Sequence, residues 1–316
     1  MESDDRESVS QLTDDLIDLE LERARAALVG LTKRPVDLLT LKSLGADIDA
    51  VLIAKNISKI SPFVSTQLEN QVIQALTEVP GAEGLTWARQ DPGFPDAGLA
   101  YNGAQTGHGI EAKAWYVCGT EITARFRASQ VVLIGKRVYI VLVAWIMSDI
   151  VFGTPTILDY ELFDAGDVAK VRDEHYHQPI NYLVAEPGDT IERTRNLQQA
   201  NVTGFRLQTT DPKALNAGRI LLGDRQWEPP YTEQSRVITE HLLNTLTYRE
   251  ETNFGKLDRI DHPQIEAFKT RILAMDYRGR TVASWTQVLR DLTSDNDAAQ
   301  KSALEVVGSL YPGTLF

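Results

Sequence analysis

Residues 138–146 (VYIVLVAWI) constrain the fold more than any other stretch, because they are apolar on both faces of any strand that they form. A strand of this kind belongs at the centre of a sheet whose two faces are both covered. The apolar run 138–147 is too short to cross a bilayer, which needs about 20 residues. The sequence therefore predicts an α/β protein with a mixed central sheet flanked by helices and without a membrane segment.

The hydrophobic period is helical before this region and again after it. We predict helices over residues 12–31, from Pro35 with a break near Gly45, and from Pro62 to Pro80. This layout predicts a helical N-terminal arm (1–60), an α/β core (61–225) and a helical C-terminal section (226–316). Further strands are expected at 85–89, 98–101, 109–117, 131–134, 156–162 and 181–184, and further helices at 167–175, 235–249, 263–275, 283–292 and 297–310.

Composition narrows the class of protein. The chain has 32 Lys and Arg against 44 Asp and Glu, a net charge of −12, which excludes a wholly basic nucleic-acid binder. A single cysteine, Cys118, excludes a disulfide framework and a cysteine-rich zinc module. The N-terminus is acidic where an export signal would be basic and then apolar. We therefore expect a cytoplasmic protein.

The negative charge is unevenly distributed along the chain. Residues 1–25 contain nine acids and three bases, a local charge of −6. Residues 113–137 contain five bases against the single acid Glu121, a local charge of +4, and residues 192–225 have six bases and three acids, or +3. A DNA-binding cleft needs positive charge only where it holds the phosphates, so this segregation leaves room for a selective DNA partner.

Residues 91–117 contain the chain's most specific chemical pattern. Asp96 follows Pro95 at the start of one expected strand, and Glu111 and Lys113 lie on the next strand after a glycine-rich loop (102–109). Residues i and i+2 of a strand share a face, so a hairpin can bring both side chains beside Asp96. Two carboxylates and one ammonium suit a Mg²⁺ site that hydrolyses a phosphodiester. Charged residues inside an apolar strand also need such a reason, because burying them is costly.

Over residues 61–150 this pattern resembles the PD-(D/E)xK nuclease superfamily, as found in type II restriction endonucleases. The resemblance implies that Asp96 and Glu111 bind Mg²⁺, with the Ala112 carbonyl as a further ligand. Lys113 would orient or activate the attacking water, and Glu69 loosely matches an acidic residue that the family places on a preceding helix. The implied activity is sequence-specific cleavage of double-stranded DNA within a restriction-modification system. A homodimer would leave 5′-phosphate ends at a palindromic site.

Two segments are expected to contact DNA. After the motif strand, polar residues alternate with apolar ones, and in similar nicking and restriction enzymes this segment approaches the DNA; its candidates are Thr123, Arg125, Arg127 and Gln130. Residues 192–206 are rich in side chains that read base edges. Those candidates are Arg193, Arg195, Asn196, Gln198, Gln199, Asn201 and Arg206. Both segments are also compatible with an ordinary solvated surface.

Other functions remain open at this point. One is a monomeric DNA repair or nicking endonuclease with the same core. Another is a metal-dependent hydrolase of a small molecule, centred on Asp173, His175 and His177. A third is a DNA-binding or scaffold protein without catalysis, in which Glu111 and Lys113 form only a surface pair.

Overall fold

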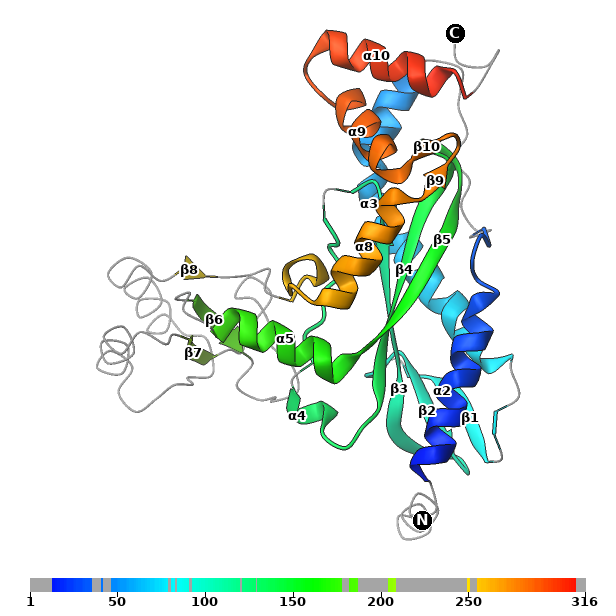
Figure 1. Cartoon of the computed structure of the whole chain (residues 1–316), viewed down its shortest axis with the longest axis vertical. Helices are drawn as coiled ribbons and strands as arrows, with labels where there is room; N and C mark the ends of the chain where they lie inside the picture. The colour runs from blue at the N-terminus through cyan, green and yellow to red at the C-terminus, as the bar shows by residue number, and fades with distance from the viewer. Residues whose placement is uncertain are drawn as a thin grey trace. The chain divides into compact units, whose positions relative to one another are not determined.

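The computed structural model divides the chain into two compact units, which are described separately (Figure 1). The first unit comprises residues 1–122, 137–163 and 266–316, and the second comprises residues 123–136 and 164–265. The structure describes residues 13–35, 41, 47–78, 81–82, 84–90, 93–119, 121–128, 130–177, 182–186, 204–208, 249–250 and 255–310. No helix in these ranges is long and apolar enough to cross a membrane.

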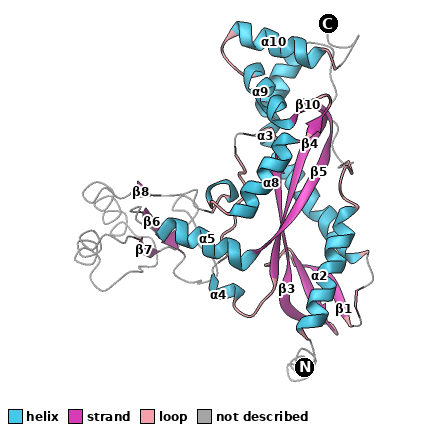
Figure 2. Ribbon diagram, viewed as in Figure 1, coloured by secondary structure: helices cyan, strands magenta, loops and turns pink. Residues whose placement is uncertain are grey.

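The first unit is built on a five-stranded mixed sheet (Figure 2). The strands lie in the order β1-β2-β3-β4-β5, in which β2 is antiparallel to both β1 and β3, and β4 is parallel to β3. Their bounds are Leu85–Arg89, Ala97–Tyr101, Ala104–Tyr116, Val138–Asp149 and Phe152–Asp164. This arrangement confirms the prediction of an α/β protein with a mixed sheet flanked by helices.

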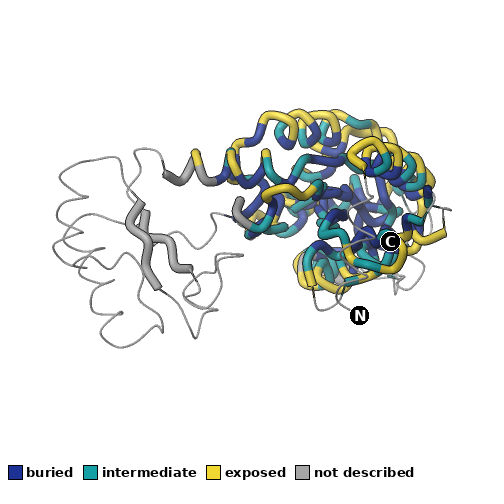
Figure 3. Tube along the Cα trace, turned by 90° about the horizontal axis from the view of Figure 1, so that it is seen from below, coloured by how far each residue is buried: buried dark blue, intermediate teal, exposed yellow. Residues whose placement is uncertain are grey.

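Strand β4 forms the centre of the hydrophobic core, as its composition predicts. Its side chains from Ile140 to Met147 are at most 1% exposed, so both of its faces are covered. On the neighbouring strands, the Trp115 and Phe163 rings both make edge contacts with Phe268. The buried residues of this unit lie beneath an outer layer of exposed helix surface (Figure 3).

Helices cover this sheet. Helix α2 (Asp14–Val29) begins at Thr13, whose hydroxyl accepts a hydrogen bond from the Leu16 N–H. The long helix α3 (Asp47–Thr77) packs along β3 and β1. Three of the expected C-terminal helices are confirmed: α8 (Pro263–Ala274), α9 (Val282–Leu292) and α10 (Asp297–Gly308). A short hairpin of β9 (Asp276–Tyr277) and β10 (Arg280–Thr281) lies between α8 and α9. The helix expected over 235–249 lies outside the described residues except for Arg249, which is in a strand.

The expected break at Pro62 is wrong, because α3 runs through this proline. A proline inside a helix removes one backbone hydrogen bond, and on its own it disfavours the helix. On the C-terminal side of Pro62, however, the buried residues Val64, Leu68 and Val72 continue one apolar face. The packing of this face against β3 and β1 holds the helix together across the proline.

Two further expectations are corrected. Residues 131–134 were expected to be a strand, but Gln130–Leu133 is a short helix (α4) that is followed by Gly135 at φ 70°, a conformation that suits glycine at a helix end. The loop expected over 102–109 is only the Asn102-Gly103 turn, with φ of 50° and 85°. Asn-Gly favours this tight hairpin turn, so residues 104–109 belong to β3.

The second unit contains α4, α5 (Ala165–His177) and a small sheet of β6 (Tyr182–Glu186), β7 (Gly204–Gln208) and β8 (Arg249–Glu250). The short helix η2 (Leu257–Arg259) also belongs to it. Arg172 of α5 is buried, and its guanidinium donates hydrogen bonds to the carbonyls of Phe126 and Ala128. This arginine therefore ties α5 to the segment that follows β3.

Candidate active site on strands β2 and β3

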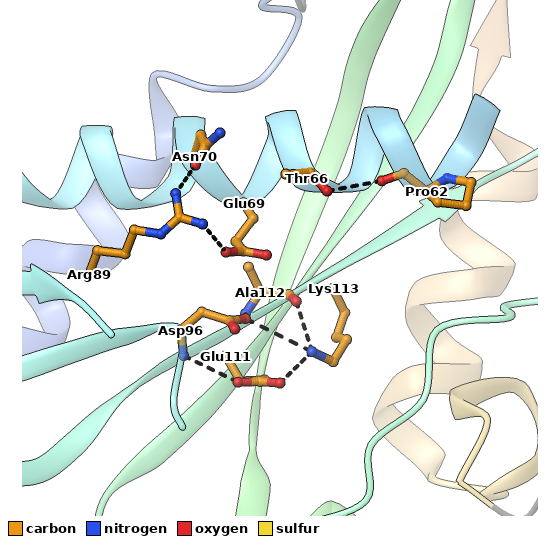
Figure 4. A network of polar contacts seen from close by, with 9 residues as sticks. All are labelled: Pro62, Thr66, Glu69, Asn70, Arg89, Asp96, Glu111, Ala112 and Lys113. Atoms are coloured by element: carbon orange, nitrogen blue, oxygen red, sulfur yellow. Dashed lines mark hydrogen bonds and ion pairs between the residues drawn. The ribbon is translucent and has the colours of Figure 1, made fainter. Parts of the chain in front are cut away.

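Asp96 and Glu111 are brought together by the pairing of β2 with β3. Asp96 lies in the bend that enters β2, and the pairing of Ala97 with Ile110 places it beside Glu111. The Asp96 N–H donates to Glu111 Oε2 at 3.2 Å, and the Ala112 N–H donates to Asp96 Oδ2 at 2.8 Å (Figure 4). The backbone therefore fixes both carboxyl groups in one place.

Lys113 completes the cluster. Its Nζ lies 2.5 Å from Glu111 Oε1, 3.0 Å from the Ala112 carbonyl oxygen and 3.9 Å from Asp96 Oδ2. The side chains of Lys113, Asp96 and Glu111 are only 17%, 19% and 14% exposed. The geometry thus brings together Asp96, Glu111, Ala112 and Lys113, the four residues on which the predicted metal site depends.

Burial, followed by repulsion from the Glu111 carboxylate, raises the pKa of Asp96 from its ordinary value of 3.8 to about 7. The Lys113 ammonium and the Ala112 N–H act in the opposite direction and lower this pKa. When both carboxyl groups are ionised, the two negative charges face one ammonium, and a net charge of −1 remains in a partly buried place. An additional cation would therefore be stabilised there.

Glu69 approaches the same cluster from α3 (Figure 4). Its Oε1 lies 3.2 Å from Nη2 of Arg89, the last residue of β1, and Nη1 of the same guanidinium is hydrogen-bonded to Asn70. Glu69 also contributes to the raised pKa of Asp96, as its weakest cause. The structure therefore places Glu69 near the other predicted residues while Arg89 holds it by one oxygen.

Arg89 was missed by the sequence analysis. A signal for it existed, because Leu85, Trp87 and Arg89 alternate along β1 and share one face of the strand. Leu85 and Trp87 are buried at 2% and 7% exposure. A charged residue that ends such a row is directed toward the covering helix and needs a partner there.

The chemistry of the donor set suits Mg²⁺. Asp96, Glu111 and the Ala112 carbonyl offer hard oxygen ligands from two side chains and one main-chain group. Within the described ranges, no group of three or more His, Cys, Asp or Glu side chains is placed to hold a metal ion. A site with two carboxylates accords with the preference of Mg²⁺ for keeping several of its waters.

The first predicted DNA-contact segment belongs to the second unit. Residues 122–128 form no strand of the main sheet, although Arg125 makes a single antiparallel bridge with Lys256. Phe126 is buried at 1% exposure, whereas Thr123 is exposed and Arg127 is half-buried, so burial alternates as the sequence suggests. Gln130 begins α4, and its side chain is outside the described part of the structure.

The other predicted contacts stay predictions. Arg193, Arg195, Asn196, Gln198, Gln199 and Asn201 lie outside the described residues. Arg206 lies in β7 opposite Val184, but its side chain is not described. The rival metal centre at Asp173, His175 and His177 lies in α5, and those side chains are not described either.

Comparisons with protein-family models, with curated proteins and with solved structures each gave no match. The function is therefore argued from the geometry of this chain.

Proposed function

We propose that the protein is a Mg²⁺-dependent endonuclease that cuts double-stranded DNA at a specific sequence, in the manner of a type II restriction enzyme. The observation that carries this proposal is the convergence of Asp96, Glu111 and Lys113, with the Lys113 ammonium also hydrogen-bonded to the Ala112 carbonyl. The sequence specificity, the homodimer and the 5′-phosphate ends rest on the resemblance of this motif to the PD-(D/E)xK nucleases.

In this proposal the carboxylates and the Ala112 carbonyl bind the metal ion, and Lys113 contacts the water or the phosphate. Asp96 and Glu111, with the Ala112 carbonyl, would hold the metal ion, which when bound neutralises phosphate charge and lowers the pKa of a water ligand. Lys113 has three N–H donors on a flexible stem, so its ammonium can orient a water against the phosphorus or steady a phosphate oxygen. The water's oxygen would bond to phosphorus as the bond from phosphorus to the 3′ oxygen breaks; the water would release a proton to solvent, and the 3′ oxygen would take up a proton from solvent. The products are a 5′-phosphate and a 3′-hydroxyl.

Cleavage of supercoiled plasmid and of phage DNA in the presence of Mg²⁺ tests this proposal. Wild-type protein should give discrete linear fragments, whereas Lys113→Ala should cut at least about 100-fold more slowly, as expected for loss of a positioned hydrogen-bond donor that stabilises the charge on the reacting phosphate. Lys301→Ala is the control, because Lys301 is exposed on α10. Its rate should equal that of wild type.

Each other outcome of this assay has a definite meaning. Nicked plasmid as the final product would favour the monomeric nicking enzyme over the dimer. A continuous smear would indicate a nuclease without sequence specificity. Intact DNA, or a Lys113→Ala protein with the wild-type rate, would contradict the proposed active site.

A further inference from the structure

The Lys113 ammonium lies among the same oxygens that the proposed metal ion would need. It contacts Glu111 Oε1 at 2.5 Å and the Ala112 carbonyl at 3.0 Å, with Asp96 Oδ2 at 3.9 Å (Figure 4). Glu111 and Ala112 lie on β3, and Asp96 lies in the bend that precedes β2. One monovalent cation thus stands at the meeting point of the donor set.

This arrangement differs from an ordinary surface ion pair. Lys170 and Glu174 of α5 lie 4.0 Å apart, and their side chains are 63% and 57% exposed. Lys113 is 17% exposed and bonds a main-chain carbonyl as well as a carboxylate. A main-chain carbonyl oxygen can accept a hydrogen bond from an ammonium, and it is also a normal ligand of a bound metal cation.

We propose that Lys113 occupies the divalent-cation site in the metal-free protein, so that its ammonium and the metal ion compete for the same oxygens. This inference rests on the metal site of the proposed function. The ammonium satisfies carboxylates that would otherwise lie unpaired in a partly buried place. A divalent ion cannot share that position with the ammonium, because like charges only about 4 Å apart repel each other strongly at the effective dielectric of a protein.

Metal entry therefore requires the ammonium to withdraw. The flexible four-carbon stem of lysine permits such a movement without a change in the backbone. Once displaced, the three N–H donors of Lys113 no longer bind protein oxygens and are available to a water or a phosphate. The same event thus loads the metal and frees the residue that the proposed reaction uses.

Titration calorimetry of Mg²⁺ into the whole protein, without DNA, tests this competition. Lys113→Met keeps the length of the side chain and removes its charge, so its Kd for Mg²⁺ should be at least about tenfold lower than that of wild type. Lys301→Met, a change at an exposed position of α10, should bind Mg²⁺ as wild type does. A Lys113→Met protein with an unchanged or higher Kd would overturn the inference.

A second measurement covers the case in which Lys113→Met does not fold without metal. Circular dichroism should then show that millimolar Mg²⁺ restores the fold, and failure to restore it would count against the inference. If neither wild type nor Lys113→Met binds Mg²⁺, the inference and the proposed metal site fall together. Tighter binding by Lys113→Met, combined with intact DNA in the cleavage assay, would leave the cation site standing and remove only the nuclease.

Discussion

Replacing Asp96 with asparagine should stabilise the metal-free protein at neutral and alkaline pH. Asparagine has the shape of aspartate, and its carbonyl oxygen can still accept the 2.8 Å hydrogen bond from the Ala112 N–H. It cannot ionise, so it carries no charge into the partly buried place beside Glu111. The substitution therefore removes the repulsion and the desolvation that raise the pKa of Asp96.

The magnitude follows from that pKa. The Asp96 carboxyl binds its proton with a pKa of about 7 in the folded protein and 3.8 in the unfolded chain. Protonation of Asp96 therefore stabilises the folded state fully below pH 3.8, and this stabilisation is lost as the pH rises through 7. A rise of this size corresponds to at most about 4 kcal/mol, at about 1.4 kcal/mol per tenfold change in proton affinity. Asp96→Asn should therefore exceed wild type in unfolding free energy by about 2–4 kcal/mol at pH 8, and by less than about 1 kcal/mol at pH 4.

Urea unfolding in EDTA between pH 4 and pH 8, followed by tryptophan fluorescence, measures this difference. Four of the five tryptophans, Trp87, Trp115, Trp145 and Trp285, belong to the first unit, so the signal reports mainly on the unit that holds Asp96. Asp276→Asn at an exposed position of β9 is the matched control and should be neutral at both pH values.

The same assay contains a second, independent check. Mg²⁺ at 100 times its wild-type Kd should stabilise wild type by about 2.7 kcal/mol and stabilise Asp96→Asn much less, because the variant keeps Glu111 but loses one of the two charged ligands. An Asp96→Asn protein that is less stable than wild type at pH 8 in EDTA would contradict the electrostatic description of this site. A difference that does not vary with pH would contradict it equally.

Three other outcomes are expected. Arg89→Met should lower the unfolding free energy by about 1 kcal/mol or less, as for an exposed ion pair. It should nevertheless slow DNA cleavage about tenfold, because Glu69 loses the partner that positions it. In a Glu69→Gln background, Arg89→Met should not slow cleavage further. Glu20→Leu should cost about 2–4 kcal/mol in urea unfolding, because the buried Glu20 carboxylate accepts the Trp87 indole N–H at 2.9 Å and a backbone N–H. Burial raises the pKa of Cys118 to about 12, so at pH 8 iodoacetamide should alkylate the folded protein about 1,000-fold more slowly than the urea-unfolded chain, as mass spectrometry can follow.

The hydrophobic period of the sequence was sufficient to predict those helices and strands whose local residue preferences agree with their packing in the fold. Strand β4 has no polar face to place, so its central position follows from its composition alone. Helix α9 begins one residue from its expected start, because the hydroxyl of Thr281 accepts the Ser284 N–H as an N-cap. Both are cases in which the residues themselves carry the signal.

The errors arose where a local rule met a stronger interaction. Pro62 disfavours helix locally, but the apolar face of α3 packs on the sheet across it. Residues 131 and 132 are valines with a strand preference, but they lie in a short helix that Gly135 ends. The Asn102-Gly103 pair carried a recognisable hairpin signal that a broader reading of the glycine-rich loop obscured.

In the candidate site, too, some contacts follow from the sequence period, whereas others depend on how the elements pack. The shared face of Glu111 and Lys113 follows from the two-residue period of a strand, and a hairpin returns them to Asp96. The pairing of Glu69 with Arg89 depends on how α3 crosses β1, and no sequence period records such a crossing. The position of the Lys113 ammonium among its acceptors likewise depends on distances between two strands.

The fold pairs some of the basic residues that the sequence shows only as a local excess of positive charge. Residues 113–137 supply five bases, and along the chain they are separated from the acidic N-terminal arm. In the first unit, however, Arg137 pairs with Asp14 and Asp18 of α2, and Lys113 faces Asp96 and Glu111. At least two of the five bases are therefore paired with carboxylates, so the sequence charge of +4 overstates the positive charge that this segment can offer to DNA phosphates in the metal-free protein.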